Sequence, residues 1–221
     1  MSTNSTVSYR ALRLLTYTII CKAVIDAVML IGRMTALNVL YTIAKAAGFI
    51  NIVACIVCLV GIITLSGKMV STFRVMVIVL ILDCVSLLLF TLDMRLAISD
   101  YTAEAAVIRI IALISIAAER LLIGAAFLFL MKGFGEILRA ADDTAAAACE
   151  KLGMIYLCCN SAGTIAAAIA ELAGAEAFRR VAYVLFILVI ILEFLMARRS
   201  YDAAFRIWRM RTSDVPESRG R

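Results

Sequence analysis

The sequence contains no histidine, and only one proline, Pro216, occurs among its 221 residues. Histidine is the usual general base, the commonest metal ligand and the ordinary pH switch, so its absence excludes histidine-dependent chemistry. Pro216 lies close to the C-terminus, and therefore no proline can kink a helix within the long apolar stretches. This counts against a transporter built on discontinuous helices.

Charged residues are also scarce. They make up 17% of the chain, whereas hydrophobic residues make up 64% and the mean hydropathy is +1.02. Soluble domains carry about 25% charged and about 45–50% apolar residues, so a soluble globular fold is excluded. Since about 20 consecutive apolar residues cross a bilayer as a helix, the sequence predicts an all-α, polytopic transmembrane helix bundle.

The apolar stretches predict six spans and both termini in the cytoplasm. A window of about 19 residues places the spans near 11–31, 37–65, 73–92, 105–131, 144–172 and 181–196. The fourth helix is expected to continue to Arg139, and Asp142, Asp143 and Thr144 are candidates to cap the fifth. Because the fifth span is rich in alanine and only mildly hydrophobic, five spans is the rival count.

The distribution of positive charge favours six spans. The predicted cytoplasmic segments hold 14 Lys and Arg residues and the predicted outer segments hold 6, in agreement with the positive-inside rule. The expected organisation is a cytoplasmic N-terminal segment at 1–10, a six-helix transmembrane domain at 11–197, and a basic juxtamembrane segment with a disordered tail at 198–221. We expect a multi-pass protein of the cell membrane.

Two helices are expected to occupy different positions in the bundle. The sixth has no polar residue between Tyr183 and Glu193, which predicts a peripheral helix facing lipid. The fifth repeats small residues at spacings of four, as in Gly163 and Ala167, which lets helix backbones approach closely. We expect the fifth helix at the centre of the bundle.

Five of the six predicted spans carry strongly polar residues near their midpoints. A charge at mid-bilayer costs about 2.5–3.5 kcal/mol on insertion scales, so these side chains are expected to face one another. Lys22 and Asp26 lie four residues apart and can pair within one helix. Arg120 is expected to reach Asp83, and Glu119 to turn toward Lys22 or a water-filled cavity. The candidate solute-binding residues are Lys22, Asp26, Asn51, Asp83, Glu119, Arg120 and Asn160.

This polar layer has two interpretations. Three carboxylates face two cations, and the extra acid would bind a proton or a cation in a low dielectric. The layer is therefore either a midplane site for a small polar or cationic solute, or an ion-pair network that only fixes helix register. Both interpretations predict that neutralising Asp83 has an effect, on activity in the first case and on stability in the second.

The seven cysteines offer no framework for disulfides, a cofactor or a metal. Cys55 and Cys58 have C-x-x-C spacing, but they lie inside a predicted span with no neighbouring ligand set, where a thiol behaves as a small hydrophobe. We expect no catalytic residue, no metal and no cofactor.

The segment after the sixth span mixes arginine with aromatic residues. Its position beside the membrane on the cytoplasmic side favours anionic lipid headgroups over nucleic acid as its partner. The expected lipid-contacting residues are Arg198, Arg199, Arg206, Trp208, Arg209 and Arg211.

Three classes of function remain. The sequence favours a transporter or solute-binding membrane subunit that uses the midplane layer. The alternative is a non-catalytic scaffold or accessory subunit with a membrane protein partner, in which the layer only fixes packing. An intramembrane enzyme is disfavoured, because the acids come with no histidine, nucleophile elbow or metal signature.

Overall fold

A computed structural model describes residues 3–35, 37–66, 72–85, 105–139 and 142–213, and in these residues the fold is entirely helical. A further helix occupies residues 72–85. The other helices are α1 (Thr3–Met34), α2 (Asn38–Ser66), α4 (Ala105–Leu138), α5 (Asp143–Ala173) and α6 (Glu176–Ser213). The all-α bundle predicted from the sequence is therefore confirmed.

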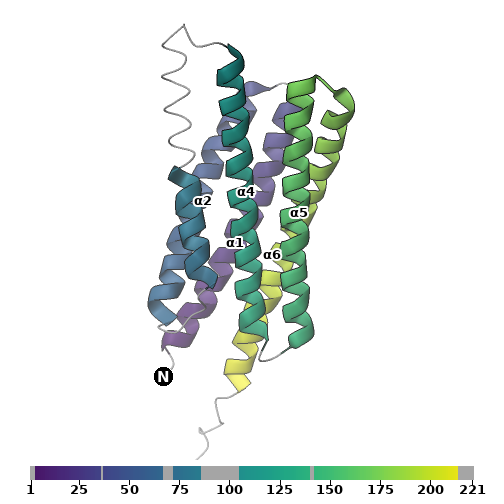
Figure 1. The fold of residues 1–221 in the computed structure, drawn as a ribbon. Coiled ribbons are helices and arrows are strands. Elements are labelled where there is room, and N and C mark those ends of the chain that lie inside the picture. The colour runs from purple at the N-terminus through teal and green to yellow at the C-terminus, as the bar shows by residue number, and fades with distance from the viewer. Residues whose placement is uncertain (1–2, 36, 67–71, 86–104, 140–141, 214–221) are drawn as a thin grey trace, which may run out of the picture.

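The helices run alternately up and down, so that the N-terminal end of α1 and the C-terminal end of α6 lie at the same end of the bundle (Figure 1). Among the helices labelled there, α1 packs against α2 and α6, and α5 packs against α4 and α6. A smaller contact joins α4 to α6. This arrangement brings the midpoints of α1, α4, α5 and α6 to a common level.

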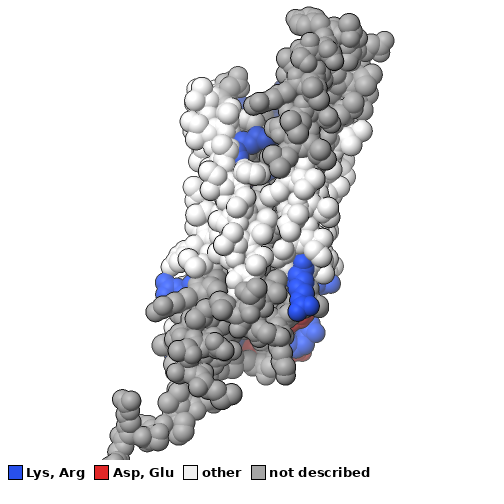
Figure 2. All heavy atoms as spheres, turned by 90° about the vertical axis from the view of Figure 1, so that its left-hand side faces the viewer, with Lys and Arg blue, Asp and Glu red and all other residues white. Residues whose placement is uncertain are grey.

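The outer surface is apolar over most of the helix length. In the described chain, five helices are long and apolar enough to cross a membrane: α1, α2, α4, α5 and α6. Large hydrophobic side chains such as Val39, Ile50, Val57 and Val184 are exposed, and this surface suits lipid contact. On the face shown in Figure 2, uncharged side chains fill the middle while Lys and Arg lie toward the two ends. The length and composition of these helices are those of a multi-pass integral membrane protein.

Several predicted helix ends agree with the structure. The fourth helix continues to Leu138, one residue short of the predicted Arg139, and α5 begins at Asp143 with Asp142 as its N-cap. The Asp142 carboxylate accepts a hydrogen bond from the backbone N–H of Ala145 at 3.0 Å. The predicted third span, 73–92, is described only as far as residue 85, and its remainder lies outside the described residues.

Two helices extend past the ends of the predicted spans. The sixth span was predicted at 181–196, and α6 continues through the arginine-rich segment to Ser213. Ala203 and Ala204 are buried in the same core as Leu138 and Ala146, so the segment after the span packs on the bundle and stays helical. The first helix begins at Thr3, within the segment expected to precede it.

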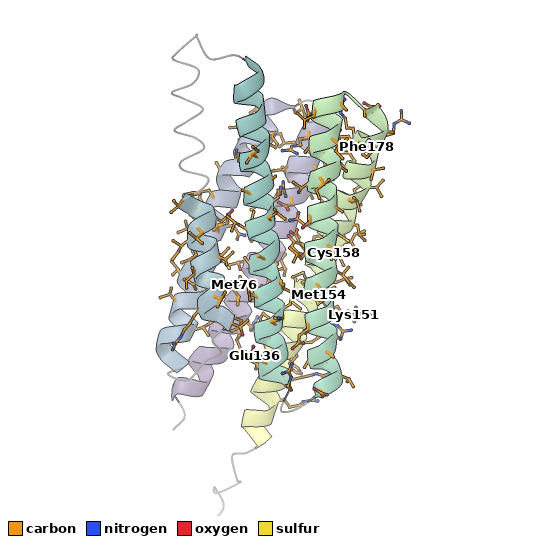
Figure 3. The ribbon with its side chains drawn as sticks, viewed as in Figure 1. Met76, Glu136, Lys151, Met154, Cys158 and Phe178 are labelled. Atoms are coloured by element: carbon orange, nitrogen blue, oxygen red, sulfur yellow. The ribbon has the colours of Figure 1, made fainter. Side chains whose placement is uncertain are left out.

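α5 uses small residues for close packing, as the sequence predicts. A Cβ on Gly153 would lie 3.0 Å from Met131 Cβ on α4, and one on Gly163 would lie 3.1 Å from Phe186 on α6. The opposite face of α5 exposes Met154, Ile165 and Leu172, so this helix also has an outer face. Figure 3 shows Met154 along this helix, together with Cys158, which is also exposed.

α6 has one buried face and one exposed face. It contacts α1, α4 and α5, and one face places Val189, Leu192, Glu193 and Met196 inside the bundle. Its opposite face exposes apolar side chains to lipid. A helix without polar residues before Glu193 was expected to be peripheral, but that single carboxylate requires a buried face.

A candidate site in a buried charge cluster

The candidate site is built around Lys22 and Asp26 on α1. The Lys22 Nζ atom lies 2.6 Å from Asp26 Oδ2, and both side chains are only 7% exposed. Residues four apart share a helix face, so this ion pair is formed within one helix, as predicted. Because both groups lie near the middle of a membrane-spanning helix, each needs an opposite charge to remain ionised.

Glu193 on α6 supplies a second carboxylate to Lys22. Its Oε1 atom lies 3.3 Å from Lys22 Nζ and accepts a hydrogen bond of 2.8 Å from the Tyr156 hydroxyl on α5. Glu193 is fully buried, and its second oxygen, Oε2, has no hydrogen-bond partner within the described chain. One carboxylate therefore connects α1, α5 and α6.

Arg120 on α4 completes the group. Its Nη1 atom lies 3.6 Å from Asp26 Oδ2, so Asp26 is shared between two cations. The Arg120 guanidinium also lies over the Phe186 ring, with Cζ 5.5 Å from the ring centroid. We call Lys22, Asp26, Arg120, Tyr156 and Glu193 the charge cluster. Its two cations and two carboxylates balance.

The two amide side chains of the predicted layer bond to backbone instead of to the charge cluster. Asn51 Nδ2 on α2 donates to the carbonyl of Thr18 on α1 at 3.0 Å, and Asn160 Nδ2 on α5 donates to the carbonyl of Arg120 at 2.6 Å. Each bond joins two helices and fixes their relative rotation. In the part of the chain that the structure describes, the buried Asn160 Oδ1 atom has no partner.

Small cavities lie on several sides of the charge cluster. The largest, about 40 Å³, is lined by polar groups of α1, α2 and α4, including Asp26, Lys45 and Arg120. A second, of about 20 Å³, lies between the Asp26 and Arg120 pair and α6. A third, also about 20 Å³, is lined by Lys22 and Asn51. Each is large enough for a water molecule in polar surroundings.

Two residues of the predicted layer remain to be placed. Asp83, on the helix at residues 72–85, is fully buried, and its expected contact with Arg120 stays a prediction. Glu119 lies on α4, but its side chain is outside the described residues, so its expected contact with Lys22 or a cavity also stays a prediction.

The residues expected to contact lipid lie on the C-terminal part of α6. The side chains of Arg198, Arg199 and Arg209 are exposed, and Arg206 forms an ion pair with Asp142 at the start of α5. The side chains of Trp208 and Arg211 lie outside the described residues. Contact of this segment with anionic lipid stays a prediction.

Sequence reasoning missed Glu193 and Tyr156. Glu193 lies near the end of the predicted sixth span, 181–196, but near the middle of α6, which continues to Ser213. Tyr156 is an isolated aromatic residue in an alanine-rich helix, and nothing in its spacing predicts a bond to another helix. The available signal was that Glu193 is the one acidic residue between Tyr183 and Met196.

The arrangement provides hydrogen-bond donors and acceptors around small spaces at mid-bilayer depth. The described residues contain no group of three or more Cys, Asp or Glu side chains that could hold a metal ion. Lys22 and Arg120 can hold a negatively charged group, and Asp26 and Glu193 can hold a positive group or a proton. Comparison of the chain with protein-family models, with curated proteins and with solved structures found no match in any of the three.

Proposed function

We propose that this integral membrane protein is a transporter, or the solute-binding membrane subunit of one, for a small polar solute that reaches the charge cluster. The observation that carries the proposal is the set of cavities against the Asp26 and Arg120 pair, which connect an ion pair at mid-bilayer depth to space for water or a polar group. A network that only fixed packing would gain nothing from such space, because unfilled volume weakens packing.

The charges around the cavity of about 40 Å³ indicate which chemical class of solute would fit. The sequence favoured a polar or cationic solute, and the lining pairs one carboxylate, Asp26, with the cations Lys22, Lys45 and Arg120. A solute that carries an acceptor for Arg120 as well as a donor for Asp26 would satisfy both sides. Small zwitterions such as amino acids fit this requirement best.

The alternative function, a scaffold or accessory subunit, is supported by a different observation. Asn51 and Asn160 bond to backbone carbonyls of neighbouring helices, and Lys22 is held tightly by Asp26. These contacts fix helix register whether or not a solute binds. They are compatible with transport, since a binding site also needs a rigid frame.

The test is uptake of radiolabelled small amino acids, with choline and acetate as a purely cationic and a purely anionic comparison, into liposomes containing the purified protein. We expect uptake of at least one amino acid, reduced about tenfold or more in Asp26→Asn and Arg120→Gln. Asp202→Asn, on the exposed surface of α6, is the matched control and should keep wild-type uptake.

The two functions give different results with the same variants. Transport would be refuted if no probe entered the liposomes faster than into empty ones, and if no probe raised the melting temperature of the detergent-purified protein. A scaffold would then remain, with Asp26→Asn lowering the melting temperature and leaving every binding measurement unchanged.

A further inference from the structure

Glu193 is held less completely than the other charged groups of the charge cluster. Asp26 is shared by Lys22 at 2.6 Å and Arg120 at 3.6 Å, whereas Glu193 has one ammonium contact, at 3.3 Å, and that ammonium belongs more closely to Asp26. The other bond to Glu193 comes from the neutral Tyr156 hydroxyl. An ionised carboxylate is costly in an apolar interior unless it is fully paired.

The unused oxygen of Glu193 gives a proton a place to bind. Oε1 takes both contacts, while Oε2 is buried and has no partner among the residues that the structure describes. A proton on Oε2 would disturb neither bond at Oε1 and would remove the buried negative charge. Lys22 would keep Asp26 as its partner, so protonation leaves no cation unpaired.

A small cavity lies about one helical turn from this position. The cavity of about 20 Å³ beside Asp26 and Arg120 is lined by Val189 and Ile190, which lie about one turn before Glu193 on α6. The charged and titratable groups that face Glu193 come from all the helices that α6 packs against: Lys22 and Asp26 on α1, Arg120 on α4 and Tyr156 on α5.

We propose that Glu193 is a proton-binding site, taking a proton from water onto Oε2 and returning it, and that a proton is the coupling ion of this protein. The second part rests on the transport function proposed above. In the ionised state the charge cluster is neutral, and with Glu193 protonated it carries one positive charge. Proton binding therefore favours entry of the negative group of a solute beside Arg120.

The experiment is infrared difference spectroscopy of the purified full chain between about pH 5 and about pH 9, which detects a buried carboxylic acid by its C=O stretch. We expect a titrating band that moves when H₂O is replaced by D₂O. The band should be absent from Glu193→Gln and unchanged in Glu176→Gln, which alters an exposed glutamate at the start of the same helix.

Two further variants test the proton site if Glu193→Gln does not fold. Tyr156→Phe removes a donor to Oε1 and should shift the band frequency. Lys22→Gln removes the ammonium and should keep the band present at the alkaline end of the range. A wild-type protein without a titrating band, or a band that Glu193→Gln retains, would overturn the proton site.

The result is separable from that of the uptake assay. A titrating band assigned to Glu193, in a protein that transports no probe and whose melting temperature no probe raises, would support the proton site and refute transport. Uptake that depends on Asp26 and Arg120, but not on a pH gradient or on Glu193, would support transport and refute proton coupling.

Discussion

Gly133 on α4 shows how closely the helices of this bundle approach at a single residue. A Cβ atom at that position would lie 2.2 Å from Cε1 of Phe73 and 2.6 Å from Cδ1 of the same ring. Phe73 cannot easily turn away, because it is fully buried and packs edge-on against Phe134, with ring centroids 6.0 Å apart. The absence of one side chain thus determines how near α4 comes to the helix at residues 72–85.

Gly133→Ala is therefore expected to destabilise the protein. Overpacking of a core costs about 1–3 kcal/mol, and we expect a lower melting temperature of the detergent-purified protein. Gly61→Ala on α2 is the matched control, since a Cβ there meets nothing within 4 Å. It should leave the melting temperature unchanged or raise it, because alanine favours helix by about 0.5–1 kcal/mol over glycine. Equal melting temperatures for the two variants would contradict this packing.

Within the site, the sequence predicts the contact between residues of one helix, and it does not predict the contacts between helices. Lys22 and Asp26 share a helix face at any arrangement of the other helices, so their spacing alone predicts the ion pair. The contacts of Glu193 with Lys22 and Tyr156 depend on the rotations of three helices about their own axes. Nothing in the spacing of residues along one helix determines those rotations, and the pairing of Arg120 with Asp26 was unforeseen for the same reason.

At the scale of elements, α6 joins the membrane domain to the connection between α4 and α5. Its 38 residues reach about 57 Å at 1.5 Å per residue, well beyond a hydrocarbon core of about 30 Å. Near its end, Arg206 forms an ion pair with Asp142, the N-cap of α5. At the same end of the bundle, Glu136 on α4 accepts a hydrogen bond from Thr72 (Figure 3).

The Asp142 carboxylate makes the stability of the fold depend on pH. Hydrogen bonds from the Thr144 hydroxyl, the Ala145 N–H and the Arg206 guanidinium lower the pKa of Asp142 below its ordinary value. A group whose pKa is lowered in the folded state stabilises the fold above its unfolded pKa of about 3.9. That contribution is lost as the pH falls through the folded pKa.

We therefore expect Asp142→Asn, which can still cap α5 but carries no charge, to melt at a lower temperature than the wild type at neutral pH. The difference should stay constant down to about pH 5 and shrink below about pH 4. Asp202→Asn, an exposed change on α6, should show no such difference. If the difference in melting temperature between Asp142→Asn and the wild type increased on acidification, this mechanism would be contradicted.

Helix ends were predictable where a local signal was present. Asp142, Asp143 and Thr144 mark the start of α5, and Gly174, with a φ of 63°, ends it in the left-handed conformation. The end of α6 was not predictable in this way, because a change from apolar to arginine-rich sequence marks the membrane surface and not the end of a helix. Ala203 and Ala204 are buried in the same core as Leu138 of α4 and Ala146 of α5, so the segment packs on the bundle beyond the predicted span.

For the whole molecule, the alternating helices place the two ends of the described chain at one end of the bundle (Figure 1). Hydropathy and charge asymmetry predict the same arrangement, since an even number of spans returns the chain to its starting side. The relative positions of the helices, with α5 packed on α4 and α6, and α6 packed on α1, α4 and α5, depend on side-chain fit and were not predictable from hydropathy.

Epitope tags at the two termini test this topology in sealed membrane vesicles. In vesicles that expose the cytoplasmic face, added protease should remove both tags. In vesicles of the opposite orientation it should remove neither. Removal of one tag with protection of the other would indicate an odd number of spans, and removal of both from outside-facing vesicles would reverse the predicted orientation.

The connection between α5 and α6 has a consequence for how the chain enters the membrane. Only Gly174 and Ala175 separate the two helices, and α5 is less hydrophobic than α6. Transfer of an alanine-rich helix alone into lipid is only weakly favourable in free energy. Transfer of a two-helix hairpin is more favourable when the second helix is strongly apolar. We therefore expect insertion of α5 to depend on α6, so that the contacts of Tyr156 and Lys22 with Glu193 form only once both arms of the hairpin are in place.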